Sequence, residues 1–344
     1  MIVVMEPKAS ENQIQKVVDY IQSKGLRVNI NRGEHLTVVA VLGDKTKINT
    51  TSISAFEGVR ELKVIQEPYK LVSRSTKEED TIIEFKNGVK IGGKERPVLM
   101  VGPCSVEKDY EGLLNVAKAA REMGCQFLRG GAFKPRTSPY DFQGLEEKGL
   151  EYLAQARKET GLLVVTEIMD TMDIPLVNQY ADILQVGARN MQNFKLLKAL
   201  GHIKKPVMLK RGPAASIKEF LLAAEHIMYN GNPNVILCER GIKGYDNDFT
   251  RNTLDIAAVP ILRKYSHLPI IVDPSHGTGR RYLIEPMGKA ALIAGAHGLM
   301  YEIHNDPDNA SSDGAQSLDL NMFRDVTKRF NKLIGRIDYD NKNS

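Results

Sequence analysis

The chain has 344 residues, of which 42% are hydrophobic and 26% are charged, and its formal net charge is +5. These values are ordinary for a globular protein, and the length allows one large domain and a small one. Every apolar run is far shorter than a bilayer span and the amino terminus does not resemble a signal sequence, so we expect a soluble, cytoplasmic protein without membrane contact. The positive charge is scattered, without a basic block carrying interleaved aromatic residues, which disfavours a nucleic-acid partner.

Residues 1–70 are predicted to form a small domain with the order strand, helix, strand, strand, helix, strand. The predicted strands are 2–5, 26–30, 36–42 and 59–65, and the predicted helices are 10–24 and 46–56. Ser10 and Gln13 have the spacing of a capping box at the start of the first helix. This order is typical of a ferredoxin-like α+β fold. Such a domain often senses a ligand or pairs subunits, but it can also only add interface, and the sequence leaves these alternatives open.

Residues 71–96 are predicted to form a linker and a β-hairpin. The stretch 68–80 is polar and charged, as linkers are, and 81–93 alternates around Asn87-Gly88, a strong hairpin-turn signal. We expect the hairpin to precede or plug the main domain.

Residues 97–344 repeat one pattern, in which a short apolar run is followed by a polar or glycine-containing end and then by a helical stretch. The predicted strands are 98–104, 127–131, 162–167, 182–188, 206–212, 235–241, 269–276 and 298–304, and the helices between them include 110–123, 145–160, 217–230 and 286–294, with a last one at 320–334. Eight such units in series predict an α/β fold, a closed (β/α)8 TIM barrel.

Chemistry in such barrels lies where the strands end. The charged or metal-binding groups at these positions are Cys104, Arg129, Lys134, Glu167, Arg189, Lys210, Arg211, Glu239, Arg240, His276, Glu302 and His304. One charged strand end would be unremarkable, but eight around one rim would be electrostatically unfavourable unless they face a ligand. We therefore predict a ligand site at this rim.

Two subsets of these groups differ in chemistry. A cationic group suits a substrate with two or more anionic groups and comprises Arg129, Lys134, Arg136, Arg189, Lys210 and Arg240. A second group could hold a borderline divalent metal and comprises Cys104, His276, Glu302 and, in the loop beyond, Asp313. Each of these four is more often structural when taken alone. Their shared placement after strands 1, 7 and 8 favours a common site, because strands 8 and 1 are neighbours in a closed barrel.

The loop 127–139 concentrates three of the cations. Gly130 and Gly131 allow a turn or a close approach to a ligand, and Thr137 and Ser138 add hydroxyl donors beside Lys134. A solvated basic turn is the alternative, but the strand end and the glycine pair favour a phosphate site.

These motifs together resemble a known enzyme family. The stretches are GPCS (102–105), LRGGAFKPRTSPY (128–140), QVGARN (185–190), MLKRG (208–212), CERG (238–241), RNTLD (251–255), DPSH (273–276) and SDGAQSL (312–318). They resemble those of 3-deoxy-D-arabino-heptulosonate 7-phosphate (DAHP) synthases, in the class with an N-terminal ferredoxin-like, ACT-like regulatory domain. The KPRTS segment is similar to that of the erythrose 4-phosphate enzymes rather than to the asparagine-containing segment of octulosonate 8-phosphate synthases.

The resemblance implies a metal-dependent condensation of phosphoenolpyruvate with D-erythrose 4-phosphate, the first step of the shikimate pathway to aromatic amino acids. It assigns phosphoenolpyruvate to Arg129, Lys134, Arg189, Lys210 and Arg240, and erythrose 4-phosphate to Lys134, Arg136, Thr137 and Ser138. It assigns the metal, Mn²⁺ or else Fe²⁺, Co²⁺ or Zn²⁺, to Cys104, His276, Glu302 and Asp313. Lys134 and Glu167 are expected to move protons, with His276 as a catalytic metal ligand.

The same resemblance implies tyrosine or phenylalanine as an effector at the N-terminal domain, and a homotetramer. Three competing functions remain open at this point. They are an octulosonate-type synthase that uses arabinose 5-phosphate, a catalytically silent anion-binding regulator, and a nucleic-acid binder.

Overall fold

The computed structural model describes residues 1–33, 36–43, 48–63, 68–135, 138, 140–246 and 248–337. The chain divides into two compact units, Met1–Asp80 with Lys264–His267, and Thr81–Arg263 with Leu268–Ser344. The division after Asp80 falls inside the region 71–96 that was predicted to connect the two domains. Each unit contains its own apolar core.

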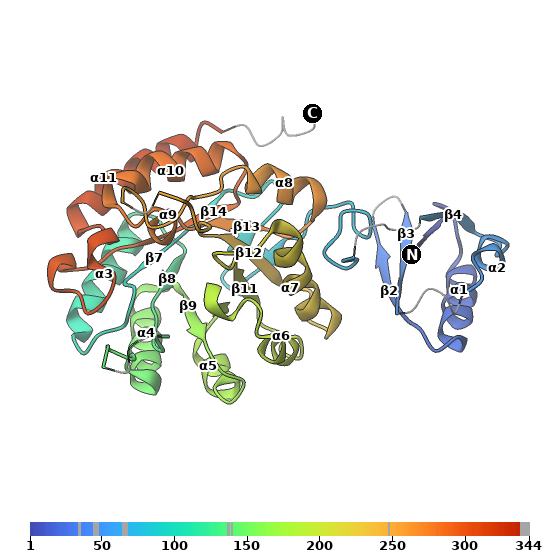
Figure 1. Ribbon diagram of the computed structural model, residues 1–344, viewed down its shortest axis with the longest axis horizontal. Helices are drawn as coiled ribbons and strands as arrows, with labels where there is room; N and C mark the ends of the chain where they lie inside the picture. Colours follow the sequence, from blue (N-terminus) through green and yellow to red (C-terminus); the bar gives the residue numbers. More distant parts are fainter. Residues whose placement is uncertain are drawn as a thin grey trace. The chain divides into compact units, whose positions relative to one another are not determined.

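The smaller unit is a four-stranded antiparallel sheet with two helices (Figure 1). Its elements are β1 (Ile2–Met5), α1 (Glu11–Ser23), β2 (Arg27–Arg32), β3 (Thr37–Leu42), α2 (Thr50–Ser54) and β4 (Val59–Lys63), and the strand order is β2-β3-β1-β4. Ser10 caps α1 in the predicted capping box with Gln13. The second helix is shorter than predicted, and residues 46–47 and 64–65 of the predicted elements lie outside the described residues.

The core of this unit forms because α1 places one apolar stripe against the sheet. Its buried residues are Ile14, Val17, Val18 and Ile21, at the spacing of one helix face. They pack with Val3 and Met5 of β1 and with Val39 and Val41 of β3. The alternation along each strand therefore directs one face of the sheet to the helices.

The segment before Asp80 contains a buried polar contact. His267 is 3% exposed, and its Nε2 lies 2.7 Å from the carbonyl oxygen of Leu71. Because a carbonyl only accepts, Nε2 carries the proton of the neutral ring. Burial lowers the pKa of His267 to about 4, despite the hydrogen bond to Leu71.

Acidification should therefore destabilise the protein through His267. The unfolded state takes up a proton on this ring near pH 6.5 and the folded state only near pH 4, so stability is lost as the pH falls through this window, by up to about 3 kcal/mol. In His267→Gln, whose amide can donate to Leu71, urea unfolding between these pH values should show a flatter pH dependence than in the parent. The exposed His202→Gln serves as the control. Equal pH dependence in His267→Gln and the parent would contradict this prediction.

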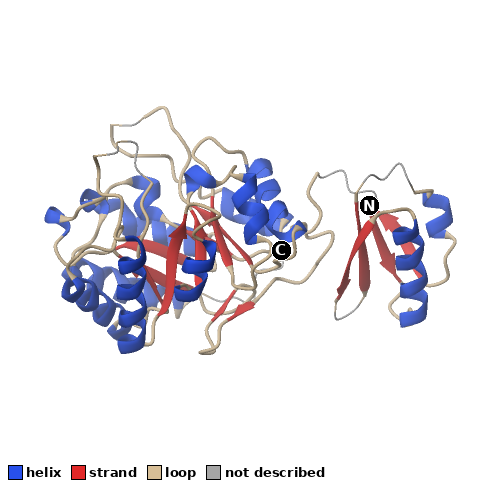
Figure 2. Cartoon of the chain, turned by 90° about the horizontal axis from the view of Figure 1, so that it is seen from below, coloured by secondary structure: helices blue, strands red, loops and turns tan. Residues whose placement is uncertain are grey.

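The larger unit is a closed barrel of eight parallel strands, which confirms the predicted fold class (Figure 1). The strands are β7 (Val98–Gly102), β8 (Phe127–Arg129), β9 (Leu163–Ile168), β10 (Ile183–Val186), β11 (Val207–Lys210), β12 (Val235–Glu239), β13 (Ile270–Val272) and β14 (Gly298–Glu302). Pairing of β14 with β7 closes the barrel. The strands are buried runs of mostly apolar residues because helices cover their outer side, as Figure 2 shows.

The helices follow the strands as the sequence pattern predicts, with two exceptions. The helices are α3 (Tyr110–Glu122), α4 (Glu146–Thr160), α5 (Ile174–Tyr180), α6 (Phe194–Leu200), α7 (Ile217–Tyr229), α8 (Ala258–Tyr265), α9 (Pro274–Thr278), α10 (Arg281–Ile293) and α11 (Leu320–Ile334). Residues 274–276 of the predicted strand 269–276 belong to the short helix α9 instead. The predicted start of α10 at Pro286 is wrong, since the helix begins at Arg281 and contains the proline. Among the described residues, none of the helices combines the length and the apolar character needed to cross a membrane.

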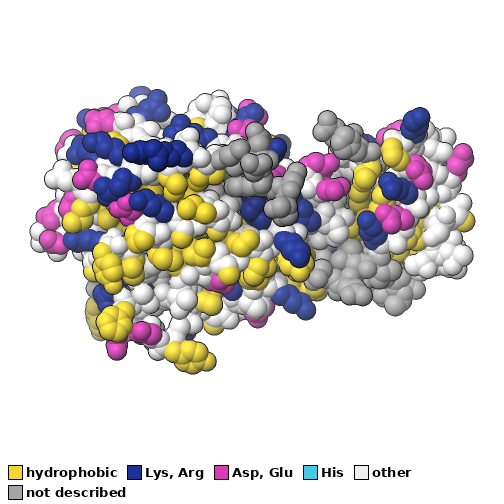
Figure 3. Space-filling model, turned by 90° about the horizontal axis from the view of Figure 1, so that it is seen from above, with side chains coloured by type: hydrophobic (Ala, Val, Ile, Leu, Met, Phe, Trp, Pro, Cys, Tyr) yellow, Lys and Arg dark blue, Asp and Glu magenta, His cyan; other side chains and the backbone are white. Residues whose placement is uncertain are grey.

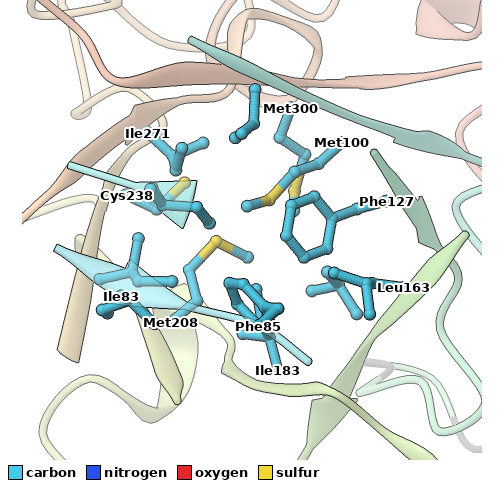
Figure 4. Packing of buried hydrophobic residues seen from close by; sticks show 14 residues of the cluster. Ile83, Phe85, Met100, Phe127, Leu163, Ile183, Met208, Cys238, Ile271 and Met300 are labelled. Carbon is cyan, nitrogen blue, oxygen red and sulfur yellow. The ribbon is translucent and has the colours of Figure 1, made fainter. Parts of the chain in front are cut away.

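A hairpin plugs the barrel, which was one of two predicted positions for it. It consists of β5 (Ile83–Glu84) and β6 (Lys90–Ile91). Phe85 packs edge-on against Phe127 of β8, with ring centroids 5.1 Å apart, and joins the cluster formed by inward-facing side chains of the barrel strands (Figure 4). The half of the barrel that holds the hairpin is therefore filled with apolar side chains.

Truncating Phe85 should show how much this plug stabilises the barrel. The side chain is 8% exposed, so Phe85→Ala leaves a cavity between the hairpin and the strands, and the free energy of unfolding should fall by about 3 kcal/mol or more. Urea denaturation measures this change. Phe249→Ala removes the same atoms from a side chain that is 69% exposed and should have little effect. Equal effects would mean that the hairpin does not contribute to the core.

Candidate active site

The carboxyl ends of the barrel strands open into a cavity of about 480 Å³. This is the end of a barrel at which active sites are built. Seven of the predicted site residues line it, namely Lys134, Glu167, Arg189, Lys210, Arg240, His276 and Asp313. Three others, Cys104, Arg129 and Glu302, are buried behind them. Cys104 contacts Lys134, Glu302 contacts His276, and Arg129 pairs with Glu302.

The four predicted metal ligands form one cluster. Ligand atoms of Cys104, His276, Glu302 and Asp313 all lie within 4.8 Å of one another. The Cys104 thiol donates to Asp313 Oδ2 at 2.9 Å, and His276 Nε2 lies 3.2 Å from Glu302 Oε1. The barrel topology explains this proximity, because β13, β14 and β7 are neighbours and carry three of the four residues at their ends. Asp313 comes from the following loop, where its backbone is left-handed with φ 51°.

The surroundings set the ionisation of these groups. Burial, and after it the nearby Glu302 carboxylate, raise the pKa of the Cys104 thiol to about 12. Burial also lowers the pKa of His276, although Asp273 and Glu302 oppose this. For Glu302 and Asp313 burial favours the neutral acid, but His276 and neighbouring cations outweigh it and lower both pKa values. At neutral pH the cluster therefore offers two carboxylates, a neutral imidazole and a thiol that must lose its proton to bind a metal.

Lys134 lies directly beside this cluster. Its Nζ donates to Cys104 Sγ at 3.1 Å and to the Cys104 carbonyl at 3.2 Å. A Cβ at position 131 would lie 2.6 Å from Lys134 Cδ, so the lysine can fold back over Cys104 only because residue 131 is glycine. Burial lowers the pKa of Lys134, but Cys104 and Glu167 raise it more, so the net shift is upward and the side chain is an ammonium.

Two further cations are buried and paired with carboxylates. Arg129 Nη1 donates to Glu302 Oε1 at 2.8 Å and to the Pro103 carbonyl at 3.0 Å. Lys210 Nζ donates to Asp273 Oδ2 at 2.5 Å. Arg129 Nε is buried and lacks a hydrogen-bond partner among the described residues. Such an unpaired donor is costly unless a ligand accepts from it.

The remaining predicted residues that line the cavity are Arg189, Arg240 and Glu167. Arg189 is exposed and donates to the Pro135 carbonyl at 2.5 Å. Arg240 donates to the His276 carbonyl at 3.2 Å, and burial lowers its pKa. The Glu167 carboxylate occupies the space of a missing side chain, since a Cβ at Gly187 would lie 2.0 Å from its Oε1.

The structure describes only part of the predicted phosphate loop. Arg136 and Thr137 lie outside the described residues. Ser138 is described, and its Oγ accepts from the amide of Tyr140 at 3.2 Å. It is not among the described residues that line the cavity.

Sequence reasoning missed several residues that hold the site together. Asp273 accepts from both Lys210 and His276. Gln316 Nε2 donates to Glu302 Oε2 at 2.5 Å, and Arg251 Nη1 donates to Asp313 Oδ1 at 3.0 Å. All three belong to motifs that carried the resemblance, namely DPSH, SDGAQSL and RNTLD, so these motifs could have identified them.

Three strand-end residues do not join the site. Arg211 follows Lys210 and therefore points to the other side of β11, where it pairs with Glu239 at 2.8 Å and Asp255 at 2.9 Å. His304 lies two residues beyond the end of β14, 3.5 Å from Glu107, and is not part of the metal-ligand cluster.

Comparison with known families gives one consistent result. Residues 80–336 match the DAHP synthetase I family, and residues 1–67 match the DAHP synthase ferredoxin-like domain. The chain belongs to the DAHP synthetase I family. This confirms the resemblance drawn from the sequence, the ferredoxin-like N-terminal domain and the expected class of enzyme.

Individual relatives agree with this membership. The chain is 49% identical over 333 residues to a phospho-2-dehydro-3-deoxyheptonate aldolase of Thermotoga maritima, covering 97% of each sequence. It is 30% identical over 265 residues to a 2-dehydro-3-deoxyphosphooctonate aldolase of Desulfotalea psychrophila, covering 72% of this chain and 93% of the relative. The crystal structure of the Thermotoga maritima DAHP synthase superposes with a TM-score of 0.76 and covers 97% of each chain. A truncated form of a Thermotoga maritima enzyme superposes with a TM-score of 0.72, covering 78% of this chain and 97% of its own.

Proposed function

We propose that the chain condenses phosphoenolpyruvate with D-erythrose 4-phosphate to give DAHP and phosphate, the first step of the shikimate pathway. One observation carries this proposal. The cavity at the barrel rim is lined by Lys134, Arg189, Lys210 and Arg240, and it adjoins a cluster of four metal-binding side chains. Fixed cations of this number suit two phosphorylated substrates, one of which also has a carboxylate.

Phosphoenolpyruvate is assigned to the cations of the cavity and to Arg129 behind it. Its binding residues are Arg129, Lys134, Arg189, Lys210 and Arg240. The unpaired Nε of Arg129 supports this assignment, because the anion would supply the missing acceptor. Erythrose 4-phosphate is assigned to Lys134 together with Arg136, Thr137 and Ser138 in the loop that follows.

The donor set fits a divalent metal ion of the borderline class, Mn²⁺ or else Fe²⁺, Co²⁺ or Zn²⁺. A thiolate, an imidazole and two carboxylates would hold it through Cys104, His276, Glu302 and Asp313. When bound, such an ion supplies Lewis-acid polarisation of an aldehyde oxygen. The ligands themselves are prepared for this, because Asp273, Arg129 and Arg251 orient His276, Glu302 and Asp313 respectively.

The chain's own groups supply the proton transfers. The C3 carbon of phosphoenolpyruvate bonds to the aldehyde carbon, water adds at C2, and phosphate leaves by C–O cleavage. Lys134 is a buried ammonium and donates a proton to the new alkoxide. Glu167 lines the same cavity, is not one of the four metal-binding residues, and accepts the proton of the attacking water.

A phosphoenolpyruvate-disappearance assay with each candidate aldose, with and without chelator, tests this function. We expect turnover with erythrose 4-phosphate, little with arabinose 5-phosphate, and none after chelation. Preference for arabinose 5-phosphate would instead assign the octulosonate reaction named for the 30%-identical relative. Absence of phosphate release with either aldose would leave a non-catalytic barrel.

We further propose that the N-terminal domain binds tyrosine or phenylalanine and regulates the barrel, and that the enzyme is a cytoplasmic homotetramer. The match of residues 1–67 to the ferredoxin-like domain of this family supports the first part. Figure 3 shows apolar side chains gathered on one face of the larger unit, which supports self-association. Exposed apolar residues of that unit include Tyr282 and Ile293 of α10 and Met322 of α11.

Deleting residues 1–70 should leave turnover close to that of the full chain and abolish inhibition by tyrosine or phenylalanine. The deletion retains Leu71 and therefore the hydrogen bond of its carbonyl with His267. Inhibition curves with tyrosine and phenylalanine, with leucine as the non-aromatic control, measure the effect. A full-length enzyme that ignores both aromatic amino acids would make the domain structural.

A further inference from the structure

Asp273 is a buried carboxylate to which the reaction assigns no step. It follows β13 directly and is 0% exposed. Its Oδ1 accepts from the His276 amide at 2.9 Å and so caps α9. Its Oδ2 accepts twice, from His276 Nδ1 at 2.7 Å and from Lys210 Nζ at 2.5 Å.

The contact with His276 fixes the chemistry of that ring. An ionised carboxylate only accepts hydrogen bonds, so the imidazole proton must lie on Nδ1. The lone pair of Nε2 is then free and faces the metal cluster, 3.2 Å from Glu302 Oε1. A carboxylate behind a histidine ligand holds the ring in place and raises its basicity toward a metal.

The contact with Lys210 concerns the binding of phosphoenolpyruvate. Lys210 is 3% exposed and lines the cavity among the cations assigned to phosphoenolpyruvate. The Lys210 ammonium and the His276 imidazole both donate to Asp273 Oδ2, so a stronger hydrogen bond from one weakens the hydrogen bond from the other. A cation on Nε2 polarises the ring and strengthens the bond from Nδ1, which leaves Lys210 freer to donate to an anion in the cavity.

We propose that Asp273 is a positioning residue that couples the metal ligand His276 to the anion-binding Lys210, so that a bound metal raises the affinity for phosphoenolpyruvate. The coupling is reciprocal, since phosphoenolpyruvate then raises metal affinity by the same factor. This inference rests on the proposed function, because it takes its two ligands from there.

Asp273→Asn tests the inference, with Asp182→Asn as the matched control. Asp182 is also a barrel carboxylate paired with an arginine, but it accepts from the Val164 amide at the opposite end of the strands. Isothermal titration of metal-free protein with Mn²⁺ and with phosphoenolpyruvate, each with and without the other, gives both affinities and their coupling. In Asp273→Asn the Kd for Mn²⁺ should rise about 10- to 100-fold. The factor by which Mn²⁺ tightens phosphoenolpyruvate binding should also shrink, whereas Asp182→Asn should match the parent in both.

The outcomes separate the inference from the proposed function. An unchanged Kd for Mn²⁺ and an unchanged coupling factor in Asp273→Asn would overturn the inference, even if the variant melts at a lower temperature. A parent protein that binds neither Mn²⁺ nor phosphoenolpyruvate would instead overturn the proposed function.

A second variant covers the case in which Asp273→Asn does not fold. Lys210→Met leaves Asp273 in place and, among the residues that the structure describes, leaves His276 as the one side chain bonded to Oδ2. It should bind Mn²⁺ more tightly than the parent, and the gain should exceed that of Arg189→Met. Arg189 is another cavity cation, but it donates to the Pro135 carbonyl rather than to Asp273. Equal gains in the two variants would mean that only the lost charge matters and would overturn the inference.

Discussion

Lys134→Ala should lower kcat by about a hundredfold or more, the scale on which loss of a donor to developing negative charge is felt. The ammonium is 6% exposed and lines the cavity 3.1 Å from Cys104 Sγ, so it is placed to meet the alkoxide that forms next to the metal cluster. Removing it deletes both a fixed positive charge and the proposed proton donor. Phosphate release at saturating concentrations of both substrates measures the loss.

Lys148→Ala provides the control for a lost lysine. Lys148 pairs with Glu151 on the exposed side of α4, and its removal should leave kcat unchanged. Near-parental turnover in Lys134→Ala would remove the assignment of proton transfer to this residue. Loss of turnover with an unchanged KM for phosphoenolpyruvate would place the effect in the chemical step rather than in binding.

Chelation should abolish activity, and added Mn²⁺ should restore it in the parent but not in Cys104→Ala. Alanine removes one of four donors. Loss of a residue that only hydrogen-bonds to a metal ligand weakens metal binding about 10- to 100-fold, so the loss of a ligand itself should exceed that. Metal content after dialysis, together with turnover across a Mn²⁺ titration, measures both effects.

Cys125→Ala is the matched control for this experiment. Cys125 is 2% exposed, as Cys104 is, but it precedes β8 at the opposite end of the strand from the cavity. Its replacement should leave metal content and the Mn²⁺ response unchanged. Full activity of a metal-stripped parent, or full rescue of Cys104→Ala, would rule out the four-residue site.

The periodicity of the sequence predicts the fold because burial follows it closely. The apolar runs of the barrel are buried on both sides, and the i, i+3, i+4 spacing in 10–24 becomes the buried stripe of α1. The exception at α10 concerns Pro286, which indicates a helix start because proline favours the first helical position. In the structure it is the sixth residue of α10, beyond the first turn, so the helix forms although proline provides no amide proton there.

Strand ends predict the site for a similar reason, since the closed barrel brings all of them to one rim. Neighbouring residues of a strand point to opposite sides, so an error of one residue in a strand boundary reverses the predicted direction of a side chain. For this reason the sequence does not distinguish Lys210, which lines the cavity, from Arg211, which points away from it. Nor can it find contacts such as Arg251 with Asp313, which joins two loops 62 positions apart. Those contacts depend on how the loops fold over the rim, which periodicity does not encode.

The hairpin inserted at the far end of the barrel also bears on the order of events in the cavity. With that end filled by Phe85 and its neighbours, molecules arrive and depart on the rim side. Arg129 and Lys210 are only 2% and 3% exposed, whereas the side chain of Arg189, which also lines the cavity, is exposed to solvent. A ligand bound to Arg129 and Lys210 would be covered by any ligand that binds after it. We therefore expect an ordered reaction, in which the enol phosphate binds first and the sugar acid leaves before the next enol phosphate binds.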